Sequence, residues 1–268
     1  MKLSNIEFSK NLRQNILMMS HNSQTAHLAS SLSCVDIVSV IYNSIINIDR
    51  IKKNNSLRDR FILSKGHAAM TLYSALYLKK IISKKDFNSY CQNNSLFEEH
   101  PSIHIKGVEA TTGSLGHGLP IANGFGLSSK ILGKKFRTIV LMSDGECNEG
   151  SVWEAAMFAA KKKLNNICVI VDYNKWQATG RSNDIMQIEP LDKKFKYFGW
   201  DVKRINGHNL KEIENALSSN NIKKKPLAII ADTIKGKGVS FMEDDNNWHY
   251  KSPDKKQLMQ ALDEINSK

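Results

Sequence analysis

The sequence predicts an α/β fold in which helices cover both faces of a mostly parallel sheet. Short apolar segments rich in β-branched residues alternate with segments whose apolar residues recur at helical spacing. Polar or glycine-containing segments directly follow several of the expected strands, and open parallel sheets bind ligands at that edge. With 268 residues, the chain is long enough for one such domain with a large core.

The expected elements follow one another with short connections. The predicted strands span residues 60–64, 138–142, 167–172, 201–205 and 227–233. The predicted helices span residues 32–41, 68–82, 119–132, 151–162 and 210–217, and a last helix starts at Asp254. Ser33 is the expected N-cap of the first of these helices. Residues 1 to about 55 are predicted to be a helical region of the same domain, which spans residues 1–268.

Composition argues against some classes of function. The formal net charge is +12, but the lysines lie in short runs that are not interleaved with aromatic residues. A solvated surface, or help with anionic ligands, is therefore favoured over nucleic-acid binding. The sequence has no apolar run of about 18 residues and its N-terminus is polar, so neither a membrane span nor a secretory signal is predicted. The widely spaced cysteines are typical of free thiols, and a cytoplasmic protein is expected.

Two polar residues at neighbouring strand ends predict a cation site. Asp144 follows one expected strand and Asn174 follows the next, thirty positions later, as in a βαβ unit. Their carboxylate and amide oxygens suit Mg²⁺ or Ca²⁺, and Mg²⁺ is commonly completed by phosphate oxygens. Gly145 lets the backbone approach a phosphate, and the next helix would point its N-terminus at that anion. Either polar residue alone is more simply explained by a turn or a helix cap.

Asp144-Gly145 followed by Asn174 resembles the thiamine diphosphate-binding motif of the transketolase superfamily, which reads G-D-G and later N. Ser143 stands in place of the first glycine, at a position that leads into the turn. The resemblance implies the thiamine diphosphate-binding fold. It also implies thiamine diphosphate and Mg²⁺ as cofactors, with Ca²⁺ as a possible substitute ion.

Two longer segments carry the same resemblance. Residues 60–68 (RFILSKGHA) are similar to the family's segment around a Gly-His pair, and residues 107–118 (GVEATTGSLGHG) match its G-V-x-x-x-T-G-x-L-G-x-G motif. The metal ligands implied by the resemblance are Asp144, Asn174 and the backbone carbonyl of Trp176. The cofactor-binding residues it implies are His67, Gly113, Leu115, His117, Gly145, Glu146, Asn174 and Lys235, the last in a K-G-x-G segment.

Four histidines are candidates for chemistry on a sugar donor. The resemblance places His27, His67, His100 and His249 in the donor-sugar channel as catalytic residues. Histidine can hold hydroxyl groups and remove a proton near neutral pH. A lone histidine is more often a surface or capping residue, and His208 is assigned to a turn and a helix cap.

One residue that the resemblance requires does not occur in the matching segments. Thiamine-dependent catalysis in the family uses a glutamate beside the aminopyrimidine ring, supplied by a second domain of the partner subunit. The sequence stops at Lys268, after the last expected helix. We therefore expect a separately encoded C-terminal subunit that supplies this glutamate in an α₂β₂ assembly, and no turnover by this chain alone. The resemblance places Glu149 at the dimer contact, near its symmetry mate.

The expected activity is transfer of a two-carbon ketol unit from a ketose donor to an aldose acceptor, with sugars or sugar phosphates as substrates. Because the cofactor motif is shared, a deoxyxylulose-phosphate-synthase-like or ketoacid-decarboxylating subunit is an alternative, although the histidines favour a sugar donor. A non-catalytic nucleotide-binding or scaffolding subunit is an alternative of another class. Against it, no G-x-G-x-x-G opens a βαβ unit, and the sequence has no G-x-x-x-x-G-K-[ST].

Overall fold

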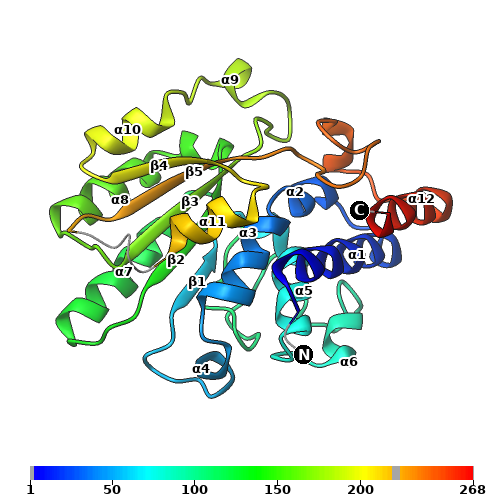
Figure 1. The fold of residues 1–268 in the computed structure, drawn as a ribbon, viewed down its shortest axis with the longest axis horizontal. Coiled ribbons are helices and arrows are strands. Elements are labelled where there is room, and N and C mark those ends of the chain that lie inside the picture. Colours follow the sequence, from blue (N-terminus) through cyan, green and yellow to red (C-terminus); the bar gives the residue numbers. More distant parts are fainter. Residues whose placement is uncertain (1–2, 219–223, 268) are drawn as a thin grey trace.

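A computed structural model describes residues 3–218 and 224–267, and it has the α/β architecture that the sequence predicts (Figure 1). Five strands form one sheet in the order β1-β2-β3-β5-β4, and every pairing is parallel. The strands are β1 Arg60–Leu63, β2 Thr138–Ser143, β3 Ile167–Tyr173, β4 Asp201–Asn206 and β5 Leu227–Asp232. The predicted strands are thereby confirmed to within one residue at each end.

The strands differ in burial according to their place in the sheet. β2 is buried at every residue, as its unbroken apolar sequence predicts for a central parallel strand. β4 lies at the edge and has no fully buried residue. It carries Lys203 and Arg204, and charged side chains on an edge strand discourage pairing with another sheet.

Helices cover both faces of the sheet (Figure 1). One face packs against α7 Gly118–Ile131, α8 Gly150–Lys161 and α10 Leu191–Tyr197. The other face packs against α2 Leu28–Ser33, α3 Val35–Val40, α5 Ala69–Leu78 and α11 Leu210–Leu217. The predicted helices at 119–132, 151–162 and 210–217 are confirmed to within one residue at each end.

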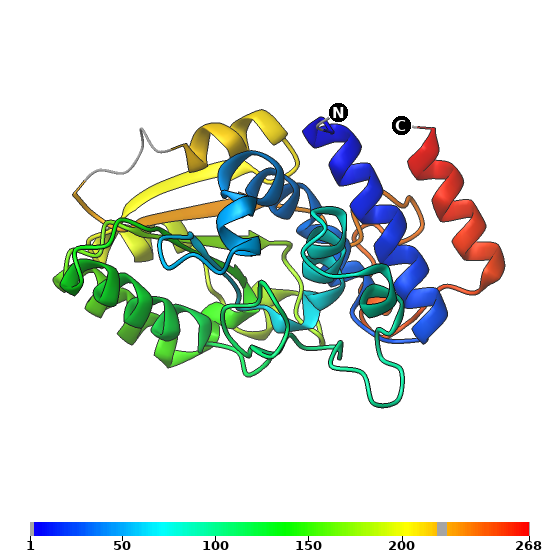
Figure 2. The same cartoon turned by 90° about the horizontal axis from the view of Figure 1, so that it is seen from below.

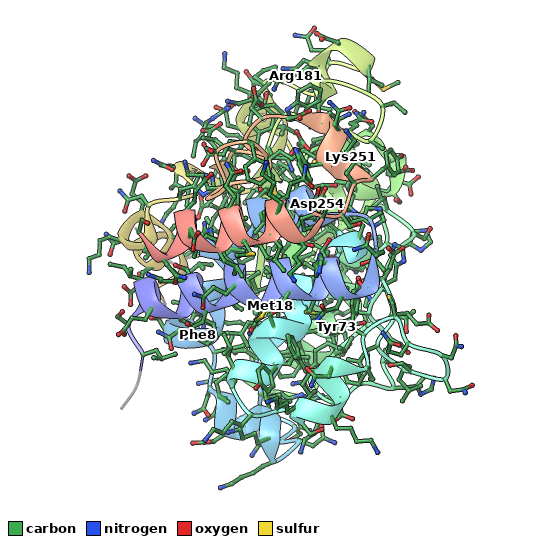
Figure 3. All side chains as sticks on the ribbon, turned by 90° about the vertical axis from the view of Figure 1, so that its right-hand side faces the viewer. Phe8, Met18, Tyr73, Arg181, Lys251 and Asp254 are labelled. Atoms are coloured by element: carbon green, nitrogen blue, oxygen red, sulfur yellow. The ribbon has the colours of Figure 1, made fainter. Side chains whose placement is uncertain are left out.

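Two long helices from opposite ends of the sequence lie side by side beyond one end of the sheet (Figures 2 and 3). They are α1 Asn5–Ser23 and α12 Lys255–Asn266. Each begins with a capping box, formed by Ser4 with Glu7 in α1 and by Asp254 with Gln257 in α12. The helix predicted to start at Asp254 is therefore confirmed. The pair closes the core over α5, to which α1 also packs.

Shorter elements complete the fold. They are the α-helices α4 Ile48–Lys52, α6 Lys84–Asn88 and α9 Ser182–Ile185, the 3₁₀ turns Gly66–Ala68, Gly145–Asn148 and Asn246–His249, and the π-helix Ile41–Ile45. All four cysteines are free thiols, as their spacing predicts. In the described part of the chain, no helix is both long and apolar enough to cross a membrane.

Two predicted helices have different boundaries in the structure. The single helix predicted at 32–41 is wrong: the chain turns at Cys34 (φ −98°, ψ 7°), between α2 and α3. Ser33 is the last residue of α2 and not an N-cap, because its hydroxyl donates to the buried Asp172 Oδ2 at 2.6 Å. The helix predicted at 68–82 ends at Leu78, and Lys80 then adopts a left-handed conformation with φ 55°.

Candidate active site

The ends of four neighbouring strands bring polar side chains to one edge of the sheet. Lys65 follows β1, Asp144 follows β2, Asn174 follows β3 and Lys235 lies just beyond β5. Because all the strands are parallel, these residues share the carboxyl edge. The loop after β3 reaches back to β2, where the Lys175 amide donates to Asp144 Oδ2 at 2.8 Å. The two strand ends that the sequence predicts to be neighbours are therefore adjacent.

Asp144 is fully buried and accepts three hydrogen bonds. Its Oδ1 accepts from the Gly145 amide at 2.9 Å, and its Oδ2 accepts from the Lys175 amide at 2.8 Å and from the Ser182 hydroxyl at 2.9 Å. Burial raises the pKa of Asp144 to about 7, the Ser182 hydrogen bond opposes this shift, and the nearby Asp172 adds to it. A buried carboxylate of this kind favours a compensating cation.

We expect the carboxyl group of Asp144 to make the stability of the metal-free protein depend on pH. Its folded-state pKa of about 7 lies above the ordinary value of 3.8, so the stability that it contributes is complete below about pH 4 and is lost as the pH rises through about 7. Between about pH 5 and 7, the melting temperature of the wild type should fall relative to that of Asp144→Asn by roughly 3 °C per pH unit. Scanning fluorimetry of both proteins measures this difference. Parallel curves would contradict the shifted titration.

Asn174 and Trp176 lie on the loop that follows β3. The amide oxygen of Asn174 accepts from the Trp176 amide at 3.0 Å, and its Nδ2 donates to the Ser33 hydroxyl at 3.5 Å. At the outer end of this loop, Arg181 donates to both carboxylate oxygens of Asp244 at 2.7 and 2.6 Å. The Trp176 indole donates to Asp244 at 2.8 Å, and its ring lies 3.8 Å from the Arg181 guanidinium carbon. These contacts tie the loop after β3 to the loop after β5.

A buried ion pair lies at the same sheet edge. Lys65 Nζ is 2.5 Å from Asp172 Oδ2, and neither side chain has exposed surface. The Ser33 and Thr233 hydroxyls also donate to the Asp172 carboxylate. Burial alone would raise the pKa of Asp172, but Lys65 and the hydrogen bonds hold it below its ordinary value. The sequence offers one signal for this pair, a charged residue inside an apolar strand, and that signal does not identify the partner.

Glu146 is fully buried and connects three segments of the site. Its Oε1 accepts from the Ser64 hydroxyl and from the Gly116 amide, the latter at 2.9 Å, and its Oε2 accepts from the Ser143 amide at 3.2 Å. Burial raises the pKa of Glu146, and these hydrogen bonds oppose the shift. The carboxylate therefore organises the ends of β1 and β2 and the turn before α7. The cofactor contact implied for Glu146 stays a prediction.

The four candidate histidines converge from four separate segments. The His27 ring centroid lies 5.5 Å from that of His67, 6.1 Å from that of His100 and 5.1 Å from that of His249. Burial lowers the pKa of His27 and of His67, and it lowers that of His249 to about 3, so these three rings are neutral near pH 7. Among the described residues, the buried His27 Nδ1 has no hydrogen-bond partner. This nitrogen can therefore take a hydrogen bond from a ligand group or a water molecule.

Gly113 and Lys235 border this histidine cluster. Gly113 has φ 143°, and a Cβ there would lie 2.7 Å from the His100 ring, so only glycine permits this approach. Lys235 is buried, and its Nζ lies 2.6 Å from Asn246 Oδ1 and 3.0 Å from His249 Nδ1. Burial lowers the pKa of Lys235 to about 7. The cluster therefore combines neutral imidazoles with an amine that titrates near neutrality.

Three of the residues mapped by resemblance lie elsewhere or take no observed part in these contacts. His117 is exposed and lines a groove of about 570 Å³ between α7 and α8, together with Glu154 and Phe158. Glu149 is exposed at the start of α8. Leu115 is half-buried, two residues from Gly113 in the turn before α7. The roles implied for His117 and Leu115 stay predictions.

The fold and the site together define a class of protein. A parallel sheet presents a buried carboxylate and an amide oxygen after adjacent strands, beside a cluster of four histidines, as expected for a domain that holds a cation and an anionic ligand. The chain belongs to the transketolase family. Residues 9–263 match the family model described as the transketolase thiamine diphosphate binding domain.

Relatives match the chain over most of its length. It is 34% identical over 261 residues to one of the subunits of the apulose-4-phosphate transketolase from Phocaeicola vulgatus, covering 97% of this chain and 93% of the relative. It is 39% identical over 259 residues to the corresponding subunit from Actinobacillus succinogenes, covering 96% and 94%. The crystal structure of transketolase from Campylobacter jejuni superposes with a TM-score of 0.86 at 28% identity. That superposition covers 98% of this chain but only 42% of the Campylobacter chain.

Proposed function

We propose that this chain is the thiamine diphosphate- and Mg²⁺-binding subunit of a transketolase, which moves a two-carbon ketol unit from a ketose to an aldose. This proposal rests on one observation: candidate metal ligands and a histidine cluster lie at the same edge of the sheet. Buried Asp144 and Asn174 offer oxygen ligands there, and four histidine rings converge beside them. The two relatives are named as subunits of a transketolase, which supports an enzyme divided between two chains, and the substrate in their names makes a ketose phosphate the first donor to test.

The residues at the ends of β2 and β3 fit a divalent cation bound together with a diphosphate. The Asp144 carboxylate, the Asn174 amide oxygen and the Trp176 carbonyl would be its protein ligands, and all three are hard oxygen donors that suit Mg²⁺, with Ca²⁺ as a substitute. A Cβ at Gly145 would lie 2.7 Å from Gln177 Cγ, so the backbone is closely approached there. Glycine at this position therefore lets the Gln177 side chain lie against the turn whose backbone would bind the diphosphate.

Residues on the other side of the site would hold the rest of the cofactor. The ammonium group of Lys235 would pair with the diphosphate, and the backbone at Gly113 and Leu115 would contact the aminopyrimidine ring, with His67 beside it. When bound, thiamine diphosphate supplies the nucleophilic carbon and the electron sink for carbon–carbon bond cleavage. The chain's own contribution is to bind and orient this group and to place neutral imidazoles at the donor sugar.

The histidines would act on the hydroxyl groups of the sugar donor. His27, His67 and His249 have lowered pKa values and are neutral at pH 7, so each ring can accept a hydrogen bond from a hydroxyl group. His27 Nδ1 is already buried and unpaired among the described residues, which makes His27 the first candidate for such a contact. His100 would line the same channel.

A variant of His27 tests this function directly. In the chain reconstituted with its partner subunit, His27→Asn should lower kcat/KM for a ketose phosphate donor by about 100-fold or more. Asparagine tolerates the left-handed backbone of this position (φ 70°), so the fold should be kept. Thermal stabilisation by thiamine diphosphate and Mg²⁺ should stay at the wild-type level. His104→Ala, at an exposed histidine, is the control. Wild-type transfer rates in His27→Asn, or no transfer by the wild type, would contradict the assignment.

The outer face of α7 and α8 is suited to the expected assembly. Met157 is 50% exposed and Phe158 is 39% exposed on α8, next to the groove that His117 lines. We place the contact with a second copy of the chain on this face, with Glu149 at the start of α8 near its symmetry mate. The partner subunit that completes each active site would then make up the α₂β₂ enzyme.

A further inference from the structure

Three polar side chains, of which Arg13 and Asp36 are buried and His208 is half-buried, connect the N-terminal helices to the loop that carries Lys235. Arg13 on α1 donates from Nη1 and Nη2 to the two carboxylate oxygens of Asp36 on α3, at 3.0 and 2.6 Å. His208, in the loop after β4, has its Nδ1 2.9 Å from Asp36 Oδ2. Burial alone would raise the pKa of Asp36, but Arg13 and His208 lower it to about 2, so this carboxylate is charged.

The hydrogen bonds of His208 fix its tautomer. The Ile234 amide donates to Nε2 at 2.8 Å, so Nε2 carries the lone pair and Nδ1 carries the proton that is donated to Asp36. His208 lies in the turn expected for it, but the helix cap falls to Asn209, which accepts from two amides in the first turn of α11. The imidazole therefore connects α3 to the segment that follows β5 through two hydrogen bonds.

The network holds the backbone on both sides of Lys235. The imidazole contacts Ile234, directly before Lys235, and Arg13 Nε donates to the carbonyl of Lys237 at 3.1 Å. Gly238 has φ 108°, and a Cβ there would lie 2.8 Å from Arg13 Nε. Glycine at this position therefore lets the guanidinium group lie against the loop.

We propose that Arg13, Asp36 and His208 form a positioning brace that fixes the Lys235 ammonium group at the cofactor site, an inference that rests on the proposed function. A buried charged network seldom stabilises a fold more than apolar side chains of the same volume do, so its specific effect is on geometry. Lys235 Nζ contacts His249 at 3.0 Å, and a displacement of the loop by about 1 Å would disturb this contact and the approach to an anionic ligand.

Substitution of His208 tests the brace in the reconstituted enzyme. The shorter side chain in His208→Asn keeps a donor near Asp36, but its amide oxygen does not reach the Ile234 amide. We expect the Kd for thiamine diphosphate, measured by calorimetry with excess Mg²⁺, to rise about tenfold, while kcat at saturating cofactor changes less than about twofold. Arg13→Lys, which removes the donor to Lys237, should have a similar effect. Lys10→Gln, one turn earlier on α1, should leave both values unchanged.

The substitution His208→Asn in a Lys235→Met background shows whether His208 acts by positioning Lys235 or by stabilising the fold in general. If the brace acts through Lys235, His208→Asn should cause no further loss of cofactor affinity there. An equal loss in both backgrounds would overturn the proposal. Hydrogen exchange of residues 233–238 in the cofactor-free chain is a second readout: His208→Asn should speed it, and unchanged exchange would contradict the brace. A wild-type enzyme that binds no thiamine diphosphate would contradict the proposed function instead.

Discussion

Replacement of Asp144 by alanine is expected to remove the thermal stabilisation that thiamine diphosphate and Mg²⁺ give to the protein. At a ligand concentration 100 times Kd, the wild type should gain about 2.7 kcal/mol. For a domain of this size that corresponds to a rise in melting temperature of about 5–10 °C. Asp144 offers the carboxylate of the proposed metal site, whereas Asn174 and Trp176 offer neutral oxygens. Without its charge, a divalent cation would be held too weakly to neutralise the diphosphate.

The measurement is a melting curve with and without the ligands, for the chain alone and for the chain co-expressed with its partner. Asp184→Ala is the matched control, because this exposed acid lies in the same loop region, on α9. It should show the full wild-type shift, and ATP with Mg²⁺ or NAD should shift neither protein. A wild-type shift retained by Asp144→Ala would place the metal elsewhere. A larger shift with ATP would favour the nucleotide-binding alternative.

The closeness of Asp144 and Asn174 was predictable from the sequence because two regularities determine it. Apolar runs mark β2 and β3 to within one residue, and a short βαβ connection makes them parallel neighbours. Residues directly after such strands must share an edge, so Asp144 and Asn174 had to be close. The histidines are different, since the spacing of His27, His67 and His249 along the chain says nothing about their distance. Only the resemblance to a family predicted that they would meet.

Sequence patterns did not identify the long-range polar contacts. Lys65 and Asp172 are 107 positions apart, and a lysine-rich chain offers an aspartate many equivalent partners. The same is true of Arg13 and His208, which meet only through Asp36. The tertiary fold determines these pairs. A buried charge is costly unless it is paired, and its partner is the opposite charge that the packing places nearby.

The wrong prediction of Ser33 as an N-cap has the same physical cause, namely the need of a buried charge for a polar partner. A serine before an apolar helical run favours a cap by local preference, which contributes about 1 kcal/mol. Ser33 instead donates to the buried carboxylate of Asp172, where an unpaired acceptor would cost more than a missing cap. Local signals therefore predicted the strands and most of the helices, and the expected N-cap at Ser33 failed because a buried charge at the site competes for its hydroxyl group.

The purified chain alone is expected to catalyse no measurable ketol transfer, and addition of a partner subunit should raise the rate by at least about 100-fold. The proposed chemistry requires a carboxyl group that exchanges a proton with the cofactor ring. Each buried carboxylate that this chain places at the site already has partners or a proposed role as a metal ligand. Asp172 is paired with Lys65, Glu146 accepts from three donors, and Asp144 is assigned to the cation.

The partner is sought in the neighbouring gene, and transfer from a ketose phosphate to an aldose is followed with increasing amounts of partner at a fixed concentration of this chain. The rate should saturate at one partner per chain, as the proposed α₂β₂ assembly requires. Substitution of the partner's catalytic glutamate by glutamine should abolish the gain while assembly persists. Steady turnover by the isolated chain would contradict the divided active site, because this chain would then have to supply the proton-exchanging carboxyl group from residues that the fold already uses.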